Sequence, residues 1–130
     1  MKILLIEDEK MLNDDLKYFI TSKGHTCDSV TKADQVIRLL EGSNEYNLIV
    51  LDLMMQRGEK LSDDESSHET GELLYHLINN KYPKAKIAIL TAKNIDEINP
   101  EILSNPRVKF ISKSSEDPLK ELLEYLKGAQ

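Results

Sequence analysis

Short apolar runs alternate with amphipathic stretches along this chain of 130 residues. Three runs of four apolar residues, at 3–6, 48–51 and 87–90, contain no charged residue. This pattern is typical of strands that are buried on both faces of a parallel sheet. Two more polar segments, 25–30 and 107–112, have the character of edge strands. The hydrophobic pattern therefore predicts five strands.

Apolar residues at helical spacing lie between these strands and after the last one. The five predicted helices are marked by Leu12, Leu16, Phe19 and Ile20; by Ala33, Val36, Ile37 and Leu40; by Leu74, Leu77 and Ile78; by Ile95, Ile98 and Ile102; and by Leu119, Leu122, Leu123 and Leu126. Thr31 is the predicted N-cap of the second helix and Pro118 suits the first turn of the fifth. Pro100 interrupts the fourth helix, and the third follows Gly71. Five βα repeats predict an α/β doubly wound parallel sheet with right-handed crossovers and helices on both faces.

Composition narrows the class of protein. Apolar residues make up 40% and charged residues 31%, as in a folded globular domain, and the length suits one domain over residues 1–130. No run reaches the roughly 18 apolar residues of a membrane span, so we expect no membrane contact. The net charge of −6 argues against direct nucleic-acid binding. A single cysteine, Cys27, excludes an internal disulfide and fits a reducing, cytoplasmic location.

Reactive side chains follow several of the predicted strands. Glu7 and Asp8 come after the first strand, Asp52 after the third, Thr91 after the fourth and Lys113 after the fifth. The carboxyl ends of parallel strands share one edge of the sheet, where ligands bind. Clustered carboxylates repel one another, and Mg²⁺ relieves this because it prefers hard oxygen ligands. A carboxylate there could accept a phosphoryl group, with a lysine and a hydroxyl to bind its oxygens.

Each of these residues also has an ordinary structural explanation. A strand-end aspartate is often a turn former, an isolated lysine is usually a solvated charge, and a threonine after a strand can cap the next helix. Their shared position at one edge of the sheet favours the joint chemical interpretation.

These residues resemble the receiver domain of two-component response regulators, the CheY-like group, over essentially the whole chain. The matching segments are Glu7-Asp8, Asp52, Thr91-Ala92 and Lys113, each after its apolar strand. The resemblance implies the flavodoxin-like strand order 2-1-3-4-5. It implies that Asp52 accepts a phosphoryl group from a sensor histidine kinase, a phosphotransfer protein or a small phosphodonor.

The resemblance also implies roles for the neighbouring residues. Asp8, Asp52 and the backbone carbonyl of Met54 would bind Mg²⁺ directly, and Glu7 would bind it mainly through water. Thr91 would contact the phosphoryl oxygens and Lys113 would pair with them.

A conformational switch belongs to the same family pattern. On phosphorylation Thr91 would move toward the phosphoryl group, and Phe110 would turn inward or else remain an ordinary core residue. The surface of the fourth helix, fifth strand and fifth helix would then bind a downstream protein, and a phosphorylation-linked homodimer is left open. The chain is not expected to be an enzyme beyond phosphoryl transfer to, and hydrolysis from, its own Asp52.

The sequence departs from the family in three places. In the family, a proline usually follows the lysine, and the peptide bond between the two is cis. Here Ser114 takes the place of the proline, so a cis Lys113–Ser114 bond is not assumed. An acidic segment at about 56–70, with net charge −3, is predicted to be an inserted loop. It is either a disordered insertion without functional effect or a loop that selects the phosphodonor or partner. Met54 and Lys93 occupy the positions that tune hydrolysis, and Met54 offers no group to position water.

Other functions of this fold fit the sequence less well. A degenerate receiver-like interaction module that is never phosphorylated would not need the complete acidic, hydroxyl and lysine set. A flavin-binding protein would need a phosphate loop after the first strand, where Glu7-Asp8-Glu9 would repel an anion. An aspartyl-phosphate phosphatase would usually carry a second aspartate at the position of Met54.

Overall fold

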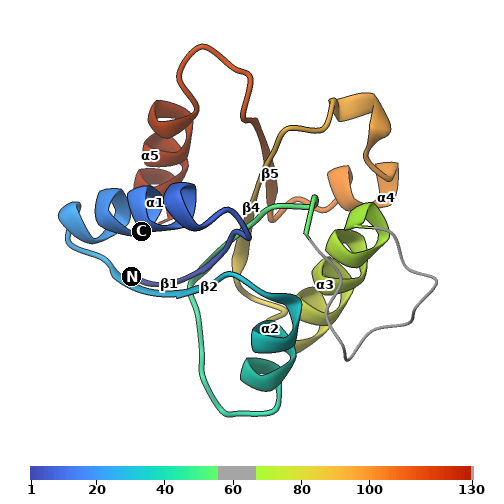
Figure 1. Ribbon diagram of the computed structural model, residues 1–130, viewed down its shortest axis with the longest axis horizontal. Helices are drawn as coiled ribbons and strands as arrows, with labels where there is room; N and C mark the ends of the chain where they lie inside the picture. Colours follow the sequence, from blue (N-terminus) through green and yellow to red (C-terminus); the bar gives the residue numbers. More distant parts are fainter. Residues whose placement is uncertain (56–66, 130) are drawn as a thin grey trace.

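The computed structural model describes residues 1–55 and 67–129, which form a five-stranded sheet between two layers of helices (Figure 1). The strands are β1 (Lys2–Ile6), β2 (Thr26–Val30), β3 (Leu48–Leu51), β4 (Lys86–Thr91) and β5 (Val108–Ser112). Every pairing is parallel, and the order is β2-β1-β3-β4-β5. The predicted α/β architecture and its strand order are confirmed.

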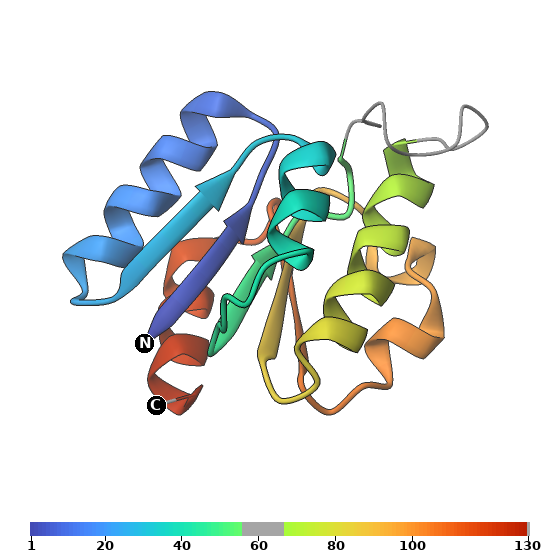
Figure 2. The same cartoon turned by 90° about the horizontal axis from the view of Figure 1, so that it is seen from below.

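The helices cover both faces of the sheet. They are α1 (Lys10–Ser22), α2 (Ala33–Leu40), α3 (Ser67–Lys81), the 3-10 turn η1 (Ile95–Glu97), α4 (Pro100–Leu103) and α5 (Pro118–Ala129). Helices α1 and α5 lie on one face, and α2, α3 and α4 lie on the other (Figure 1). Figure 2 shows the strands from a second side, with the arrowheads of β1 and β2 pointing the same way.

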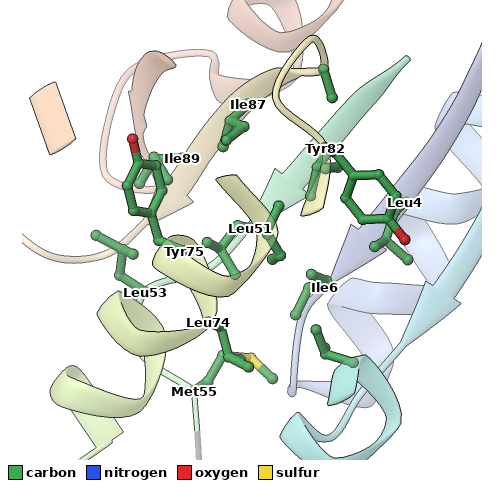
Figure 3. Packing of buried hydrophobic residues seen from close by; sticks show 14 of the residues in the cluster. Leu4, Ile6, Leu51, Leu53, Met55, Leu74, Tyr75, Tyr82, Ile87 and Ile89 are labelled. Carbon is green, nitrogen blue, oxygen red and sulfur yellow. The ribbon is translucent and has the colours of Figure 1, made fainter. Parts of the chain in front are cut away.

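Two hydrophobic clusters hold these layers together. Alternate residues of a strand face opposite sides of the sheet, so Leu4 and Ile6 pack toward α2–α4 while Ile3 and Leu5 pack toward α1 and α5. All four side chains are fully buried. Figure 3 shows part of the first cluster, which α3 supplies with Leu74 and Tyr75. Burial on both faces explains why the central strands are uninterrupted apolar runs.

The helix ends show which sequence signals were correct. Gly24 adopts a positive φ of 91° after α1, and its N–H donates to the Thr21 carbonyl at 3.0 Å, as a C-terminal glycine does. Pro118 begins α5 as predicted. The predicted N-cap of α2 was wrong, because Lys32 and not Thr31 is the cap residue. The Gln35 side chain instead accepts the backbone N–H groups of Thr31 and Lys32, at 2.9 and 3.0 Å.

Three further boundaries differ from the prediction. Helix α3 starts at Ser67, so the last four residues of the predicted loop at 56–70 are helical; the rest of that loop, 56–66, lies outside the described residues. The predicted fourth helix is divided into η1 and the four-residue α4, which Pro100 begins. Thr91 is the last residue of β4 and does not follow the strand.

Two smaller observations complete the fold. Every peptide bond in residues 1–55 and 67–129 is trans, including Lys113–Ser114. None of the helices in those ranges has both the length and the apolar character needed to cross a membrane.

Candidate functional site

Three carboxylates meet where β1 and β3 end. Glu7 and Asp8 follow β1, and Asp52 follows β3 at the same level of the sheet, with its N–H donating to the Ile6 carbonyl at 3.1 Å. One carboxylate oxygen from each residue lies within 4.8 Å of the others. Within residues 1–55 and 67–129, no other group of three or more His, Cys, Asp or Glu side chains has this geometry. Glu7 and Asp52 are buried and Asp8 is half-buried.

Lys113 brings the only ammonium group seen to pair with this cluster in the described part of the chain. Its Nζ lies 2.8 Å from Asp52 Oδ2 and 2.5 Å from Glu7 Oε1. Burial by itself lowers the pKa of Lys113, but the hydrogen bonds and attraction of Asp52 and Glu7 outweigh burial and raise that pKa overall. Lys113 is therefore held in its charged form between two carboxylates.

The backbone around Lys113 is anchored on both sides. The Lys113 N–H donates to the Thr91 carbonyl at 2.8 Å, which continues the β4–β5 pairing. The next N–H, of Ser114, donates to Ser112 Oγ at 3.1 Å. A proline at position 114 has no N–H for this bond. The local chain thus uses a serine turn where the family pattern has proline.

The carboxyl group of Glu7 has a strongly raised pKa. Burial raises the pKa of Glu7 to about 7, against the lowering effects of Lys113 and of the Glu9 N–H, which donates to Glu7 Oε2 at 3.1 Å. The nearby charge of Asp52 raises the Glu7 pKa further. The site therefore holds more negative charge than its lysine balances, which is the condition that a divalent cation relieves.

Hard oxygen donors in this arrangement fit Mg²⁺. The cation prefers carboxylates, backbone carbonyls and water, and it usually takes one or two carboxylates from the protein. Asp8, Asp52 and Glu7 would supply the carboxylates, and Asp52 Oδ1 also accepts the Met54 N–H at 2.9 Å. The Met54 side chain is 40% exposed.

Thr91, the last residue of β4, and Lys93, two residues beyond it, form a second part of the site. Thr91 is fully buried, and its Oγ1 accepts the Lys93 N–H at 3.3 Å. The Lys93 ammonium donates to the Glu97 carbonyl at 3.0 Å, so this side chain supports η1. Burial lowers the pKa of Lys93. The backbone and side chain of Lys93 together link the Thr91 hydroxyl to η1.

Phe110 occupies a different environment from the charged residues. It lies on β5, half-buried, against the hydrophobic cluster that the sheet shares with α2, α3 and α4. Its ring therefore contributes to packing on that face of the sheet.

Asn13 also lies beside the site, although the sequence pattern did not single it out. This residue is buried on the inner face of α1, and its Nδ2 donates to the carbonyls of Glu7 and Val30, both at 2.9 Å. It ties together the ends of β1 and β2 beside the carboxylates. The sequence feature that could have identified Asn13 is its position as a polar residue next to the apolar stripe of Leu12 and Leu16.

Comparison with known proteins agrees with this geometry. The sequence matches the response regulator receiver domain family over residues 3–127. It is 35% identical to the transcriptional regulatory protein BasR of Escherichia coli and 33% identical to PmrA of Pectobacterium parmentieri, in each case over 72% of this chain. The chain covers 37% of the length of these relatives.

Solved structures share the fold along nearly the whole chain. A two-component response regulator from Clostridium difficile is 26% identical, with a TM-score of 0.73 over 99% of this chain and 94% of that one. The response regulator TrrA of Thermotoga maritima, in complex with Mg²⁺-BeF, is 24% identical, with a TM-score of 0.70 over 99% and 98%. With the match over residues 3–127, the chain belongs to the receiver domain family of two-component response regulators.

Proposed function

We propose that the chain is an active, phosphorylatable receiver and that Asp52 is its phosphoacceptor. Receiver domains are signalling domains, and phosphorylation-dependent signalling is the general function of the family. The observation that supports an active rather than a degenerate receiver is the contact of Lys113 with Asp52 and Glu7, at 2.8 and 2.5 Å, beside a third carboxylate. A degenerate module would gain nothing from this excess of buried negative charge.

The proposed reaction is transfer of a phosphoryl group to Asp52. A carboxylate oxygen of Asp52 forms a bond to phosphorus, and the bond from phosphorus to the donor breaks, with its electron pair leaving on the donor. The donor is a phosphohistidine of a sensor kinase or phosphotransfer protein, or a small acyl phosphate. Mg²⁺ held by Glu7, Asp8, Asp52 and the Met54 carbonyl would neutralise charge on the phosphoryl oxygens.

Lys113 and Thr91 act on the product in this proposal. The Lys113 ammonium, already within 2.8 Å of Asp52, would pair with the phosphoryl oxygens. The Thr91 hydroxyl, which here accepts the Lys93 N–H, would give up that bond and donate its own hydrogen to a phosphoryl oxygen. This exchange is the proposed start of the switch, and Phe110 would respond through packing alone.

Output through another protein is part of the same proposal. BasR and PmrA are transcriptional regulatory proteins, and this chain covers 37% of their length. We propose that phosphorylation alters the surface of α4, β5 and α5, and that a downstream protein or a second copy of the chain binds there. Helix α4 has only four residues here, whereas β5 has five and α5 has twelve.

The decisive experiment is phosphorylation in vitro. The protein is incubated with Mg²⁺ and acetyl phosphate, and its intact mass is measured. We expect a single phosphoryl adduct in the wild type and none in Asp52→Asn or after removal of Mg²⁺ with EDTA. An unmodified wild type would favour the degenerate receiver, and an adduct that persists in Asp52→Asn would place the phosphoacceptor elsewhere.

The lifetime of the adduct tests the residues next to the site. Met54 has no polar group to position water, and the Lys93 ammonium is bound to the Glu97 carbonyl. We therefore expect the phosphoryl group to persist for minutes or longer after the phosphodonor is removed, as followed by intact mass. A lifetime of a few seconds would contradict this expectation.

A further inference from the structure

Helix α3 touches the backbone of the residue that follows Asp52. Gly71 is the fifth residue of α3, and a Cβ added to it would lie 1.8 Å from the carbonyl oxygen of Leu53, 2.3 Å from its carbonyl carbon and 2.5 Å from its Cα. By contrast, a Cβ on Gly42 would find its nearest neighbour at 3.5 Å, and one on Gly128 would meet nothing within 4 Å. Only hydrogen at position 71 permits the observed approach.

The contact falls on the turn that carries the proposed phosphoacceptor. Leu53 stands between Asp52 and Met54, and the Met54 N–H donates to Asp52 Oδ1 at 2.9 Å. Leu53, Met55 and Leu74 are fully buried in one cluster, which Figure 3 shows around α3. The turn is thus held by β3 at its start, by its own hydrogen bond, and by α3 from the side.

We propose that Gly71 is a positioning residue for the Asp52 site. By letting the α3 backbone rest on Leu53, it sets the direction of the Leu53 peptide, and with it the places of the Asp52 carboxylate and the Met54 carbonyl. The proposal rests on the proposed function for its chemical meaning. It assigns to a residue without a side chain a role in aligning the magnesium ligands.

A side chain at position 71 would displace backbone atoms rather than other side chains. An added methyl group would overlap backbone atoms, so no change of rotamer relieves the clash. Carbon atoms pack at about 3.5–4.0 Å, whereas the added Cβ would lie 2.3 Å from the Leu53 carbonyl carbon, so the backbone would have to move by more than about 1 Å. The Asp52 N–H is fixed to Ile6 on β1, which leaves the turn or the helix to move. A misplacement of about 1 Å at a reacting group can cost about 100-fold in rate.

The test compares Gly71→Ala with two matched variants. Gly128→Ala makes the same change at an open position of a helix, and Leu74→Ala loosens the packing of α3 on the turn without pushing the backbone. Each protein is titrated with MgCl₂ and followed by ¹H–¹⁵N NMR. Phosphorylation by acetyl phosphate is timed by intact mass, and unfolding is measured in urea.

We expect Gly71→Ala to lose about 10- to 100-fold in Mg²⁺ affinity, the usual loss when a residue that orients metal ligands is changed. Its phosphorylation should slow by a similar factor. Gly128→Ala should match the wild type, and Leu74→Ala should lose stability while it keeps its Mg²⁺ affinity. Equal Mg²⁺ affinity in Gly71→Ala and wild type, or an equal loss in Leu74→Ala, would overturn the proposal. So would a Gly71→Ala protein that does not fold, since the contact would then support the whole fold.

A measurement without metal separates this proposal from the proposed function. The Met54 N–H is bonded to Asp52 Oδ1, so its hydrogen exchange reports the alignment of the turn. We expect faster exchange of this amide in Gly71→Ala than in Leu74→Ala, with no Mg²⁺ present. If the wild type accepts no phosphoryl group, the proposed function fails while this readout still decides the positioning role. Unchanged exchange would reject that role.

Discussion

The two edges of the sheet both contain partly buried cations, but they balance charge in opposite ways. At the amino edge, before β5, Arg107 donates from Nη1 to the carbonyls of Ala85 and Tyr82, at 2.5 and 3.3 Å, and from Nη2 to Asn79 Oδ1. All three acceptors are neutral. The Arg107 carbonyl in turn accepts the hydroxyl of Tyr125 at 2.6 Å. This edge therefore joins β4, β5, α3 and α5 through bonds that satisfy each partner.

At the carboxyl edge, one lysine faces three carboxylates. Lys113 contacts Asp52 and Glu7, and burial raises the pKa of Glu7 to about 7. Burying like charges is costly unless they are paired or bound to metal. The amino edge thus satisfies its cation with neutral acceptors, whereas the carboxyl edge retains an unbalanced negative charge of the kind that a metal cation relieves.

The largest effect is expected when the carboxyl edge loses its lysine. Lys113→Met leaves Glu7 and Asp52 buried without a cation, and removing one partner of a buried ion pair typically costs about 3–5 kcal/mol. We expect a loss of about 4 kcal/mol in the free energy of unfolding in urea at pH 8 with no Mg²⁺. Saturating Mg²⁺ should restore part of the loss. A change below about 1 kcal/mol would show that water already screens these carboxylates.

The next effect depends on pH and belongs to Glu7. Its pKa rises from an ordinary 4.5 to about 7 in the folded protein, so the folded state binds more protons than the unfolded state between these values. The stabilising contribution is complete below about pH 4.5 and is lost as the pH rises through about 7. The full difference corresponds to about 3 kcal/mol.

Glu7→Gln isolates this contribution, because its amide has the shape of the protonated acid. Without Mg²⁺, we expect the wild type to lose up to about 3 kcal/mol relative to Glu7→Gln as the pH is raised from 5 to 8. Urea unfolding at several pH values measures the difference. A constant difference across this range would mean that Glu7 titrates as an ordinary carboxyl group.

A smaller effect is expected at the amino edge. Arg107→Met keeps an unbranched apolar stem but leaves the two carbonyls and the Asn79 side chain without this donor. Because this region is only partly buried, water can replace some of these bonds, and we expect a loss of about 2 kcal/mol in urea unfolding. Mg²⁺ affinity should not change. A loss of Mg²⁺ affinity in Arg107→Met would remove the distinction between the two edges.

The same contrast explains what the sequence could predict. Asp52 and Lys113 could be predicted because each directly follows a predicted strand, and parallel strands bring such residues to one edge. The hydrogen bonds of Arg107 could not be predicted from the sequence, because its three acceptors come close to it only in the tertiary structure and no local pattern marks them. Arg107 was predicted to lie in a strand, yet β5 begins one residue later.

The helices α3 and α4 show a second limit of prediction from the sequence, which concerns where helices begin. Helix α3 begins at Ser67, although residues 67–70 have no apolar periodicity. The contacts with the rest of the molecule come from later residues of the helix, such as Gly71 against Leu53 and Leu74 in the hydrophobic cluster. Between β4 and β5, apolar spacing predicted one helix, but Pro100 and local bonds divide it into η1 and α4. Spacing identifies which residues are buried, but tertiary contacts and local hydrogen bonds decide where each turn of helix begins.

The smallest effect is expected from a second lysine pair, which provides the control for Lys113. Lys10 Nζ lies 3.0 Å from Asp14 Oδ1 on α1, almost the distance from Lys113 to Asp52, but the two side chains are 77% and 59% exposed. Exposed pairs are screened by water and contribute about 0.5 kcal/mol or less. We expect Lys10→Met to change urea unfolding within that limit, with no response to Mg²⁺. Equal losses in Lys10→Met and Lys113→Met would mean that burial does not set the difference, and that the contrast between the two edges needs another cause.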